Sequence, residues 1–305
     1  MQIAVASGKG GTGKTTVAVN LAAAASMTAP QVQLLDCDVE EPNCHIFLSP
    51  SITERETVAI PVPKVHEARC SRCGMCGEAC AFHAILVGSK RVIVFPELCH
   101  GCGACSYLCP ERCIEEVPRS IGVVEEGTAL LGGQEIKFGH GVLNTGEALA
   151  SPLVKRVREK SSAGSLVIVD SPPGTSCTMV QSVKGSDLCL LVTEPTPFGL
   201  HDLVLAYETV VKLGVPAAVL INRSDIGDDR VDRFCADRGI PVAMRIPLDK
   251  GLARMYAEGR VLVTSSEEYA QMFKTLYAKV LELLQNPGVS GSVKHHSLPE
   301  EVHSL

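Results

Sequence analysis

Fourteen cysteines are spread along the 305-residue chain, and eight of them fall in two runs of identical spacing. Each run has the pattern C-x2-C-x2-C-x3-C, from Cys70 to Cys80 and from Cys99 to Cys109. Thiolates at such short intervals are typical ligands of iron–sulfur clusters, and eight of them suit two [4Fe–4S] clusters. Tetrahedral zinc usually takes two C-x2-C pairs separated by a longer loop, so zinc fits poorly. Disulfides are disfavoured because Met1 runs directly into an apolar strand with nothing resembling a signal peptide, so we expect a reducing, cytoplasmic location.

The spacing matches bacterial two-cluster ferredoxins, in which the last cysteine of each run binds the other cluster. This crossing predicts one cluster on Cys70, Cys73, Cys76 and Cys109, and the other on Cys99, Cys102, Cys105 and Cys80. A shift of 29 residues lays one run on the other, and Cys113 then falls on Ala84. We therefore expect Cys113 to be a buried thiol and not a ligand. One departure is that Ala81 follows the first run where Pro110 follows the second.

The N-terminal segment carries a second kind of chemistry. A short apolar strand, residues 2–7, leads into the pattern G-x4-G-K-T, and a helical stretch follows through Ala25. Glycines let backbone N–H groups surround phosphate oxygens, the lysine reaches the β and γ phosphates, and the threonine hydroxyl binds Mg²⁺. This context predicts a site for ATP or ADP, with the binding residues Gly8, Lys9, Gly10, Gly11, Thr12, Gly13, Lys14, Thr15 and Thr16.

A lysine at position 9 distinguishes this loop from most P-loops. The segment from Lys9 to Thr16 resembles the deviant Walker A motif of the MinD/ParA/Mrp class of ATPases, which includes the nitrogenase iron protein. The resemblance implies Mg²⁺-dependent ATP hydrolysis in a homodimer, or in a heterodimer with a paralogue. It also implies that Lys9 crosses the dimer interface to the partner's nucleotide, where it would act catalytically on the transferring γ-phosphoryl group together with Lys14.

The same resemblance implies roles for acids that end two apolar strands. After strand 32–36, Asp38 would position the attacking water or a water of the Mg²⁺ shell, with Asp36 beside it; either could instead be a turn residue. After strand 166–170, Asp170 would hold Mg²⁺ together with Thr15, and the N–H of Gly174 would sense the γ-phosphate.

Apolar strands alternate with helical stretches in the C-terminal half. Strands 187–193 and 215–221 flank a helix over 200–213, which calls for a parallel sheet with crossover helices. Asn222 and Pro247 match the places where the resembled class contacts the adenine base. Both residue types are also common in turns.

The ATPase pattern is interrupted between Asp38 and Asp170. We expect an α/β fold, a mostly parallel P-loop NTPase sheet with flanking helices, plus a small inserted α+β ferredoxin domain. The expected ranges are 1–59 and 119–286 for the ATPase domain, 60–118 for the insertion, with a hairpin over 84–95, and 287–305 for a disordered tail. Strands at 121–125 and 134–138 would return the chain to the ATPase sheet.

Composition excludes two classes of partner. The formal net charge is −6 and no block of Lys or Arg occurs, so the sequence lacks the charge pattern of nucleic-acid binding. Apolar stretches fall short of the roughly 18 to 20 residues that cross a bilayer. The last predicted helix, 267–284, lacks the basic amphipathic face that binds MinD to membranes.

Two departures from the resembled class bear on function. Mrp-type cluster scaffolds carry a late C-x-x-C pair, and none follows Asp170. Cys177 lies where the nitrogenase iron protein has one cluster ligand, but a second cysteine near 142–145 is missing. We expect a dimeric ATPase that couples nucleotide state to electron transfer through two clusters, with a redox protein as partner. The alternatives are an assembly or positioning ATPase that uses the ferredoxin as a docking module, and an iron–sulfur cluster carrier.

Overall fold

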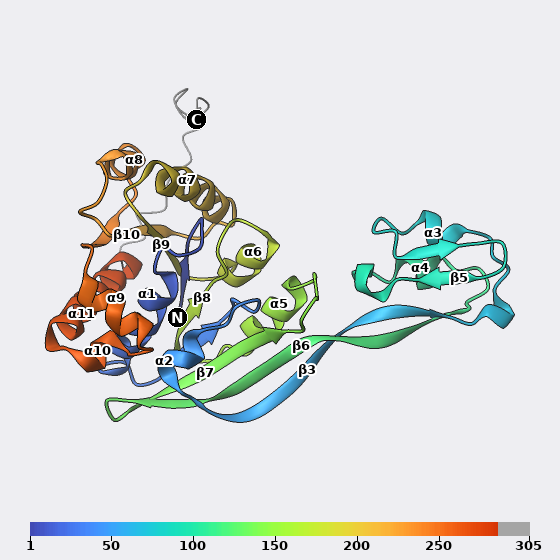
Figure 1. The fold of residues 1–305 in the computed structure, drawn as a ribbon, viewed down its shortest axis with the longest axis horizontal. Helices are drawn as coiled ribbons and strands as arrows, with labels where there is room; N and C mark the ends of the chain where they lie inside the picture. Colours follow the sequence, from blue (N-terminus) through green and yellow to red (C-terminus); the bar gives the residue numbers. More distant parts are fainter. Residues whose placement is uncertain (286–305) are drawn as a thin grey trace.

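A nine-stranded sheet forms the centre of the molecule, in the order β11-β10-β9-β1-β8-β2-β7-β6-β3. The computed structural model describes residues 1–285, so the expected tail at 287–305 lies outside the described part. Neighbours from β11 to β7 run parallel, and β6 runs antiparallel to both of its neighbours, β7 and β3. The expected mostly parallel sheet with flanking helices is confirmed (Figure 1).

Most of the parallel strands are short and buried on both faces, as their unbroken apolar runs predict; the exceptions are the two ends of the strand at 134–143 and the strand at 242–246, which are partly exposed. They are β1 (Gln2–Ala6), β2 (Val32–Asp36), β7 (Gln134–Leu143), β8 (Leu166–Asp170), β9 (Leu188–Thr193), β10 (Ala217–Asn222) and β11 (Val242–Ile246). The helices that connect and cover them are α1 (Lys14–Ser26), α2 (Cys44–Leu48), α5 (Ser151–Glu159), α6 (Cys177–Val183), α7 (Pro197–Lys212), α8 (Arg230–Asp237), α9 (Lys250–Ala257), α10 (Leu262–Ser265) and α11 (Glu267–Gln285).

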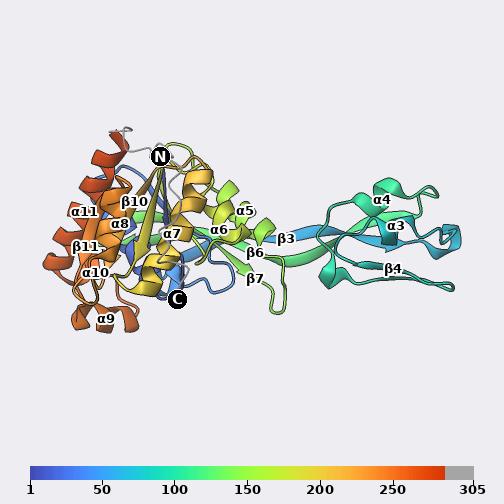
Figure 2. The same ribbon diagram turned by 90° about the horizontal axis from the view of Figure 1, so that it is seen from above.

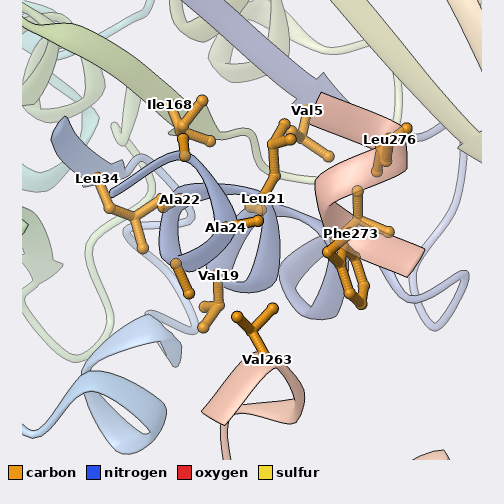
Figure 3. Close-up of a cluster of buried hydrophobic side chains, with 14 of the residues drawn as sticks. Val5, Val19, Leu21, Ala22, Ala24, Leu34, Ile168, Val263, Phe273 and Leu276 are labelled. Atoms are coloured by element: carbon orange, nitrogen blue, oxygen red, sulfur yellow. The ribbon is translucent and has the colours of Figure 1, made fainter. Parts of the chain in front are cut away.

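Helix α1 lies between the sheet and helices α10 and α11 (Figure 3). Leu21 and Ala22 are fully buried, as are Phe273 and Leu276 of α11. A helix that is apolar around most of its circumference must be covered on all sides, and the small side chains of α1 allow this close packing. On the other face of the sheet, α5, α6, α7 and α8 enclose a second core. The P-loop that precedes α1 is thus anchored on a rigid helix.

Two long antiparallel strands leave the body of the sheet together. Strand β3 (Ser51–Val65) pairs with β6 (Ile114–Leu131) along its whole length, but β7 accompanies β6 only from Gly122 onward. The stretches 59–65 and 114–120 therefore form a two-stranded arm, roughly 20 Å long at about 3.4 Å per residue. Pro61 and Pro118 lie opposite each other in this arm. Prolines are tolerated there because each arm strand has one edge that no other strand pairs with.

The arm carries a small lobe, residues 66–113, away from the body (Figures 1 and 2). We call it the cysteine lobe. Its elements are η1 (Glu67–Arg69), α3 (Met75–Glu78), β4 (Ile85–Val87), β5 (Val92–Val94), η2 (Pro96–Leu98) and α4 (Ala104–Leu108). The 29-residue shift that aligns the cysteine runs also lays η1 on η2 and the start of α3 on the start of α4.

The strands near the lobe differ from the expected ranges. The Pro-rich segment at 60–63 is part of β3, and the chain reaches the lobe as continuous strand, so the turn from body to lobe falls near 65 and 114 and not at 60 and 118. The expected strands at 121–125 and 134–138 are parts of the longer β6 and β7. The hairpin expected over 84–95 is present as β4 and β5. Among the described residues, no helix is both long and apolar enough to span a membrane.

Candidate functional site

The P-loop connects β1 to α1 at the carboxyl edge of the parallel strands. Helix α1 begins directly after Gly13, whose φ of 93° lies in the left-handed region that glycine tolerates. A Cβ atom at Gly8 would lie 2.1 Å from the backbone oxygen of Asp202, so only glycine fits there. The loop and the first turn of α1 form the arrangement that binds phosphate groups through backbone N–H donors.

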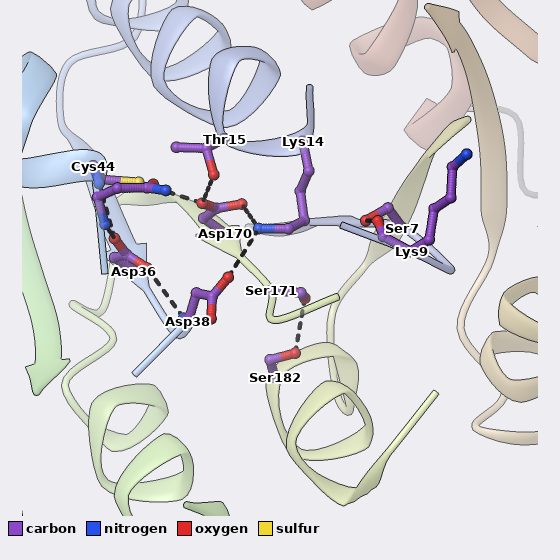
Figure 4. Close-up of polar contacts among 11 residues, drawn as sticks. Ser7, Lys9, Lys14, Thr15, Asp36, Asp38, Cys44, Asp170, Ser171 and Ser182 are labelled. Carbon is purple, nitrogen blue, oxygen red and sulfur yellow. Dashed lines mark hydrogen bonds and ion pairs between the residues drawn. The ribbon is translucent and has the colours of Figure 1, made fainter. Parts of the chain in front are cut away.

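Lys14 lies inside this site between two carboxylates (Figure 4). Its Nζ atom is 2.9 Å from Oδ1 of Asp170 and 3.7 Å from Oδ2 of Asp38. Burial alone would lower the pKa of Lys14, but the charges of Asp170 and Asp38 raise it above its usual value. Lys14 is therefore a permanent buried cation, which suits contact with phosphate oxygens.

The two acids that follow β2 have different surroundings. Asp36 is fully buried and accepts hydrogen bonds of 3.0 Å from the backbone N–H groups of Asp38, Asn43 and Cys44. It therefore holds the loop between β2 and α2. Asp38 is partly exposed and faces Lys14; burial raises the pKa of Asp38 to about 6, although Lys14 opposes this rise. Asp38 is the acid that can meet a substrate.

Asp170 ends β8 at the floor of the site. Its Oδ2 accepts a hydrogen bond of 2.7 Å from the hydroxyl of Thr15, and its side chain is fully buried. The thiol of Cys44 lies 3.5 Å from the same oxygen. A hydroxyl and a carboxylate in contact are oxygen ligands of the kind Mg²⁺ prefers, so Thr15 and Asp170 fit the expected ion.

The lysine at position 9 points away from Lys14 (Figure 4). Its Nζ atom lies 3.6 Å from a carboxylate oxygen of Glu194, which also pairs with Arg223. The Lys9 side chain remains one-third exposed. This lysine is directed toward the outside of its own site, and it must leave Glu194 before it can reach another nucleotide.

The remaining predicted nucleotide contacts all border the P-loop. Gly174, with φ 90°, donates its N–H to the carbonyl of Ser7 at 2.9 Å, which holds the loop after β8 against the P-loop. Asn222 donates its side-chain amide to the carbonyl of Thr12 at 2.8 Å. Pro247 is exposed directly after β11, whose last residue pairs with Asn222. Asn222 thus supports the P-loop, and it is also the residue predicted to contact the adenine base.

The eight cysteines of the two runs lie in the cysteine lobe and gather in two groups. One hollow is lined by Cys70, Cys73, Cys76 and Cys109, and by Val65 and Ile114 at the end of the arm; we call it the distal site. The other is lined by Cys80, Cys99, Cys102 and Cys105, and by Pro61, Pro63 and Glu116 within the arm; we call it the proximal site. Each group has the crossed composition of three cysteines from one run and one from the other.

Backbone N–H groups point at several of these sulfurs. Ala84 donates to Sγ of Cys80 at 3.2 Å, and Cys113 donates to Sγ of Cys109 at 3.4 Å. Gly101 donates to Sγ of Cys99 at 3.4 Å. Four thiolates with N–H donors around a small hollow match what a [4Fe–4S] cluster needs, so the residues present fit the expected groups. Cys73 and Cys102, one sulfur in each group, are exposed.

Cysteines outside the two groups have other surroundings. Cys37, Cys44, Cys189 and Cys235 are buried in the body, and Cys177 is exposed at the start of α6. Cys113 is buried beside the distal group, as its overlay on Ala84 predicts for a non-ligand.

Three residues of the site were missed by sequence reasoning. Glu194 binds Lys9, and Cys44 touches Asp170. His140 of β7 lies 2.8 Å from Glu125 of β6. Glu194 follows strand β9 directly, so the tendency of polar residues at strand ends to face a ligand would have indicated it. Cys44 carries no such signal, because its partner Asp170 comes from a distant part of the chain. His140 lies within a strand and not at its end, so its position does not indicate a ligand either.

The nucleotide edge of the sheet is tied directly to the root of the arm. The loop that carries Asp38 accepts, at the carbonyl of Val39, a hydrogen bond of 2.9 Å from Leu143 at the end of β7. Leu143 in turn pairs with Gly122 of β6, where the arm begins. Next to this path, Arg119 of the arm forms a two-bond ion pair with Glu147, whose side chain is almost fully buried.

Comparisons with known proteins bear on this arrangement. The family described as "CobQ/CobB/MinD/ParA nucleotide binding domain" matches residues 3–263. An uncharacterized protein of Methanocaldococcus jannaschii is 31% identical over 267 residues, which are 85% of this chain and 90% of that protein. The iron–sulfur cluster carrier protein of Pyrococcus horikoshii is 26% identical over 267 residues, 81% of this chain and 74% of that protein.

A solved structure shares the fold. The septum site-determining protein MinD of Pyrococcus horikoshii, in complex with Mg-ADP, superimposes with a TM-score of 0.58 at 18% identity. The match covers 96% of this chain and 99% of that one. At this identity the likeness speaks for the fold alone.

Proposed function

The chain belongs to the CobQ/CobB/MinD/ParA nucleotide-binding family and is a P-loop ATPase of the MinD/ParA group; from this premise we propose that it couples nucleotide state to electron transfer through two iron–sulfur clusters in the cysteine lobe. The working unit would be a dimer, with a redox protein as the further partner. We infer a homodimer because Lys9 is directed away from its own nucleotide site (Figure 4).

At the nucleotide site, Gly8 to Thr16 would hold the phosphates, with Lys14 on the β and γ groups. Thr15 and Asp170 would hold Mg²⁺, and Asp38 would orient the attacking water. Lys9 would leave Glu194 and reach the partner's nucleotide, where its charge would stabilise the transferring phosphoryl group. Asn222 and Pro247 would border the base, and Gly174 would respond to the γ-phosphate.

Support for resident clusters comes from the grouping of eight sulfurs into two sets of four. When bound, a [4Fe–4S] cluster supplies one-electron chemistry at a potential set by its surroundings. The lobe's part is to bind it through four thiolates, to donate N–H groups to the sulfurs, and to leave one sulfur of each set near the surface. An exposed sulfur is where a redox partner could approach.

The coupling is supported by the hydrogen bond between Val39 and Leu143. Because Val39 follows Asp38 directly, a movement of this loop on nucleotide binding or hydrolysis would act on the end of β7 and so on the root of the arm. The strand β6 then continues without a break into the lobe. Nucleotide state would thus change how the lobe is presented to a partner.

Delivery of clusters to other proteins is the second candidate, and the comparisons favour it. Relatives from Pyrococcus horikoshii and Methanocaldococcus jannaschii, 26% and 23% identical, are named iron–sulfur cluster carrier proteins. Against it, each set of four cysteines comes from a single chain and would retain its cluster, whereas transfer usually needs ligands shared between chains. A third candidate is an assembly ATPase that uses the lobe as a docking module. It predicts clusters whose redox properties do not change when nucleotide binds.

One experiment separates these functions. The full-length protein is purified without oxygen, its iron is counted, and the EPR spectrum of the reduced protein is recorded with and without ATP and Mg²⁺. Coupled electron transfer predicts about eight iron atoms per chain and a nucleotide-dependent change in line shape or reducibility. The variant Lys14→Ala, which should not bind ATP, serves as the control and should lack the response.

The carrier function is tested on the same sample. Incubation with an apo-ferredoxin, followed by size-exclusion chromatography, shows whether iron moves to the acceptor. Retention of all iron in the presence of ATP supports electron transfer. ATP-dependent transfer of iron to the acceptor would contradict that proposal and support the carrier function. Clusters whose EPR spectrum does not change with ATP would support the docking module.

A further inference from the structure

The distal site contains a fifth cysteine, Cys113, and the proximal site has only four. Sγ of Cys113 lies 3.5 Å from Sγ of Cys109, and Cys113 is 1% exposed. Cys113 also lines the distal hollow together with the four predicted ligands. The 29-residue repeat places Ala84 at the equivalent position beside Cys80.

The two halves of the repeat are otherwise alike at this point. In each half the residue four positions after the last cysteine donates its backbone N–H to that cysteine's sulfur, at 3.4 Å from Cys113 and at 3.2 Å from Ala84. The side chain at this position differs between the halves: it is a thiol in the distal half and a methyl group in the proximal half. The protein therefore contains its own reference for the effect of this thiol.

A thiol in this position faces the sulfurs of two predicted ligands, Cys109 at 3.5 Å and, as a further hydrogen-bond partner, Cys70. Burial in apolar surroundings keeps a cysteine protonated, so Cys113 carries an S–H group, which is a weak donor. Cys109, if it is a cluster ligand, is a thiolate and accepts hydrogen bonds. The short distance between the sulfurs of Cys113 and Cys109 then places the S–H of Cys113 on the ligand sulfur.

We propose that Cys113 is a positioning residue that donates an S–H hydrogen bond to Cys109 and thereby raises the reduction potential of the distal cluster above that of the proximal one, which rests on the proposed function. Hydrogen bonds to ligand sulfur stabilise the more negative, reduced form, so they raise the potential. An added electron would accordingly reside first at the distal site, at the end of the arm.

The test exchanges the two side chains in the full-length protein. Cys113→Ala removes the donor at the distal site, and Ala84→Cys adds it at the proximal site. Both midpoint potentials are measured by EPR-monitored redox titration, with iron content as the control for assembly. At a fixed potential, we expect Cys113→Ala to change the ratio of reduced to oxidised distal cluster by about three- to tenfold toward the oxidised form, a shift of about 28 to 59 mV for one electron.

Ala84→Cys should raise the potential of the proximal cluster and leave the potential of the distal cluster unchanged. Cys113→Ser, which keeps a hydroxyl donor, should retain or raise the distal potential. Unchanged midpoints in both Cys113→Ala and Ala84→Cys, with full iron content, would overturn the inference while leaving the proposed function intact. Loss of iron from Cys113→Ala would also overturn it, because Cys113 would then be a ligand. A wild-type protein without clusters would refute the proposed function itself.

Discussion

At the scale of single residues, the two P-loop lysines face different partners. Lys14 is buried between Asp38 and Asp170, whereas Lys9 lies on Glu194 and is one-third exposed. Lys14 therefore belongs to its own nucleotide site, whereas Lys9 is the residue that we propose to act on a second chain's nucleotide once its ion pair with Glu194 opens. Replacing Lys14 should therefore impair nucleotide binding, and replacing Lys9 should impair hydrolysis.

Replacement of Lys9 by Ala should lower ATP hydrolysis by about 100-fold or more, because a cation that stabilises the transferring phosphoryl group is lost. Nucleotide binding by the single chain should change little. Steady-state phosphate release and equilibrium binding of a fluorescent ATP analogue measure the two effects. Lys184→Ala, a change on the body surface outside the P-loop, is the matched control. Equal loss of binding and hydrolysis in Lys9→Ala would place this lysine in its own site instead.

The pH dependence of hydrolysis should follow Asp38. Its pKa is raised to about 6, so the folded protein binds this proton more tightly than the unfolded chain does. Lowering the pH through about 6 protonates Asp38 and removes the acceptor for the attacking water, so the rate should fall. The contribution of this group to the free energy of unfolding changes in the opposite sense and increases as the pH falls from about 6 toward 4.

A pH–rate profile at saturating ATP checks this expectation, with nucleotide affinity measured at each pH. Asp38→Asn should remove most of the activity at every pH while ATP still binds. A rate that stays constant between pH 7 and 5 would exclude Asp38 as the acid that controls hydrolysis.

Residues of the site could be predicted where chemistry is encoded locally. The cysteine spacing and the P-loop pattern are each contained in a dozen residues, and the structure brings their members together. Glu194 could not be assigned to Lys9 in this way, because the two residues are far apart in the chain and meet only through the order of β1 and β9 in the sheet. The ties of Val39 to Leu143 and of Asn222 to Thr12 likewise exist only in the folded chain.

At the scale of elements, the arm is the part that the sequence described least well. Its strands contain prolines and many exposed polar residues, so they lack the apolar pattern that indicated β1, β2 and β8. In the arm, β3 and β6 are held in place by pairing with each other and not by burial in a core. The buried parallel strands and the long helices α1, α7 and α11 were predicted within a few residues, because their apolar periodicity reflects the core directly.

The ion pair between Arg119 and Glu147 anchors the root of the arm to the segment before α5. Arg119→Ala should lower the free energy of unfolding by about 1 to 3 kcal/mol, because the almost fully buried carboxylate of Glu147 loses its charged partner. Urea denaturation followed by circular dichroism measures the change. Arg254→Ala, which breaks an exposed pair with Glu258, should cost less than about 0.5 kcal/mol. Equal effects of the two variants would show that the anchor adds nothing.

At the scale of the whole molecule, body and lobe meet through two strands that end side by side. Val65 and Ile114 are direct partners in the ladder, so the lobe occupies the place of a hairpin turn. The buried residues of both cores include none of the eight cysteines of the lobe's two groups, and only Cys99 packs against the edge of the second core, so the body should fold without the lobe.

Replacement of residues 66–113 by Asn-Gly, a two-residue hairpin turn, tests this organisation. The shortened protein should fold, bind nucleotide with unchanged affinity and contain no iron. Thermal unfolding, isothermal titration with ATP and iron analysis measure the three properties. The matched control is the full chain with Cys73→Ser and Cys102→Ser, which should lose iron but keep the lobe's mass. Aggregation of the shortened protein would show that the lobe is needed for the body to fold.

The direct pairing of Val65 with Ile114 also has a consequence for the order in which the chain assembles. Bringing β3 and β6 together across an unfolded segment 66–113 costs about 3 kcal/mol of loop-closure entropy. A lobe that has already closed around its metal holds the two ends next to each other and removes most of that cost. Because β6 already pairs with β7 through a tight turn, iron supply during synthesis would then set how fast the sheet acquires its last strand, β3. A chain starved of iron would leave the edge of β6 open to aggregation.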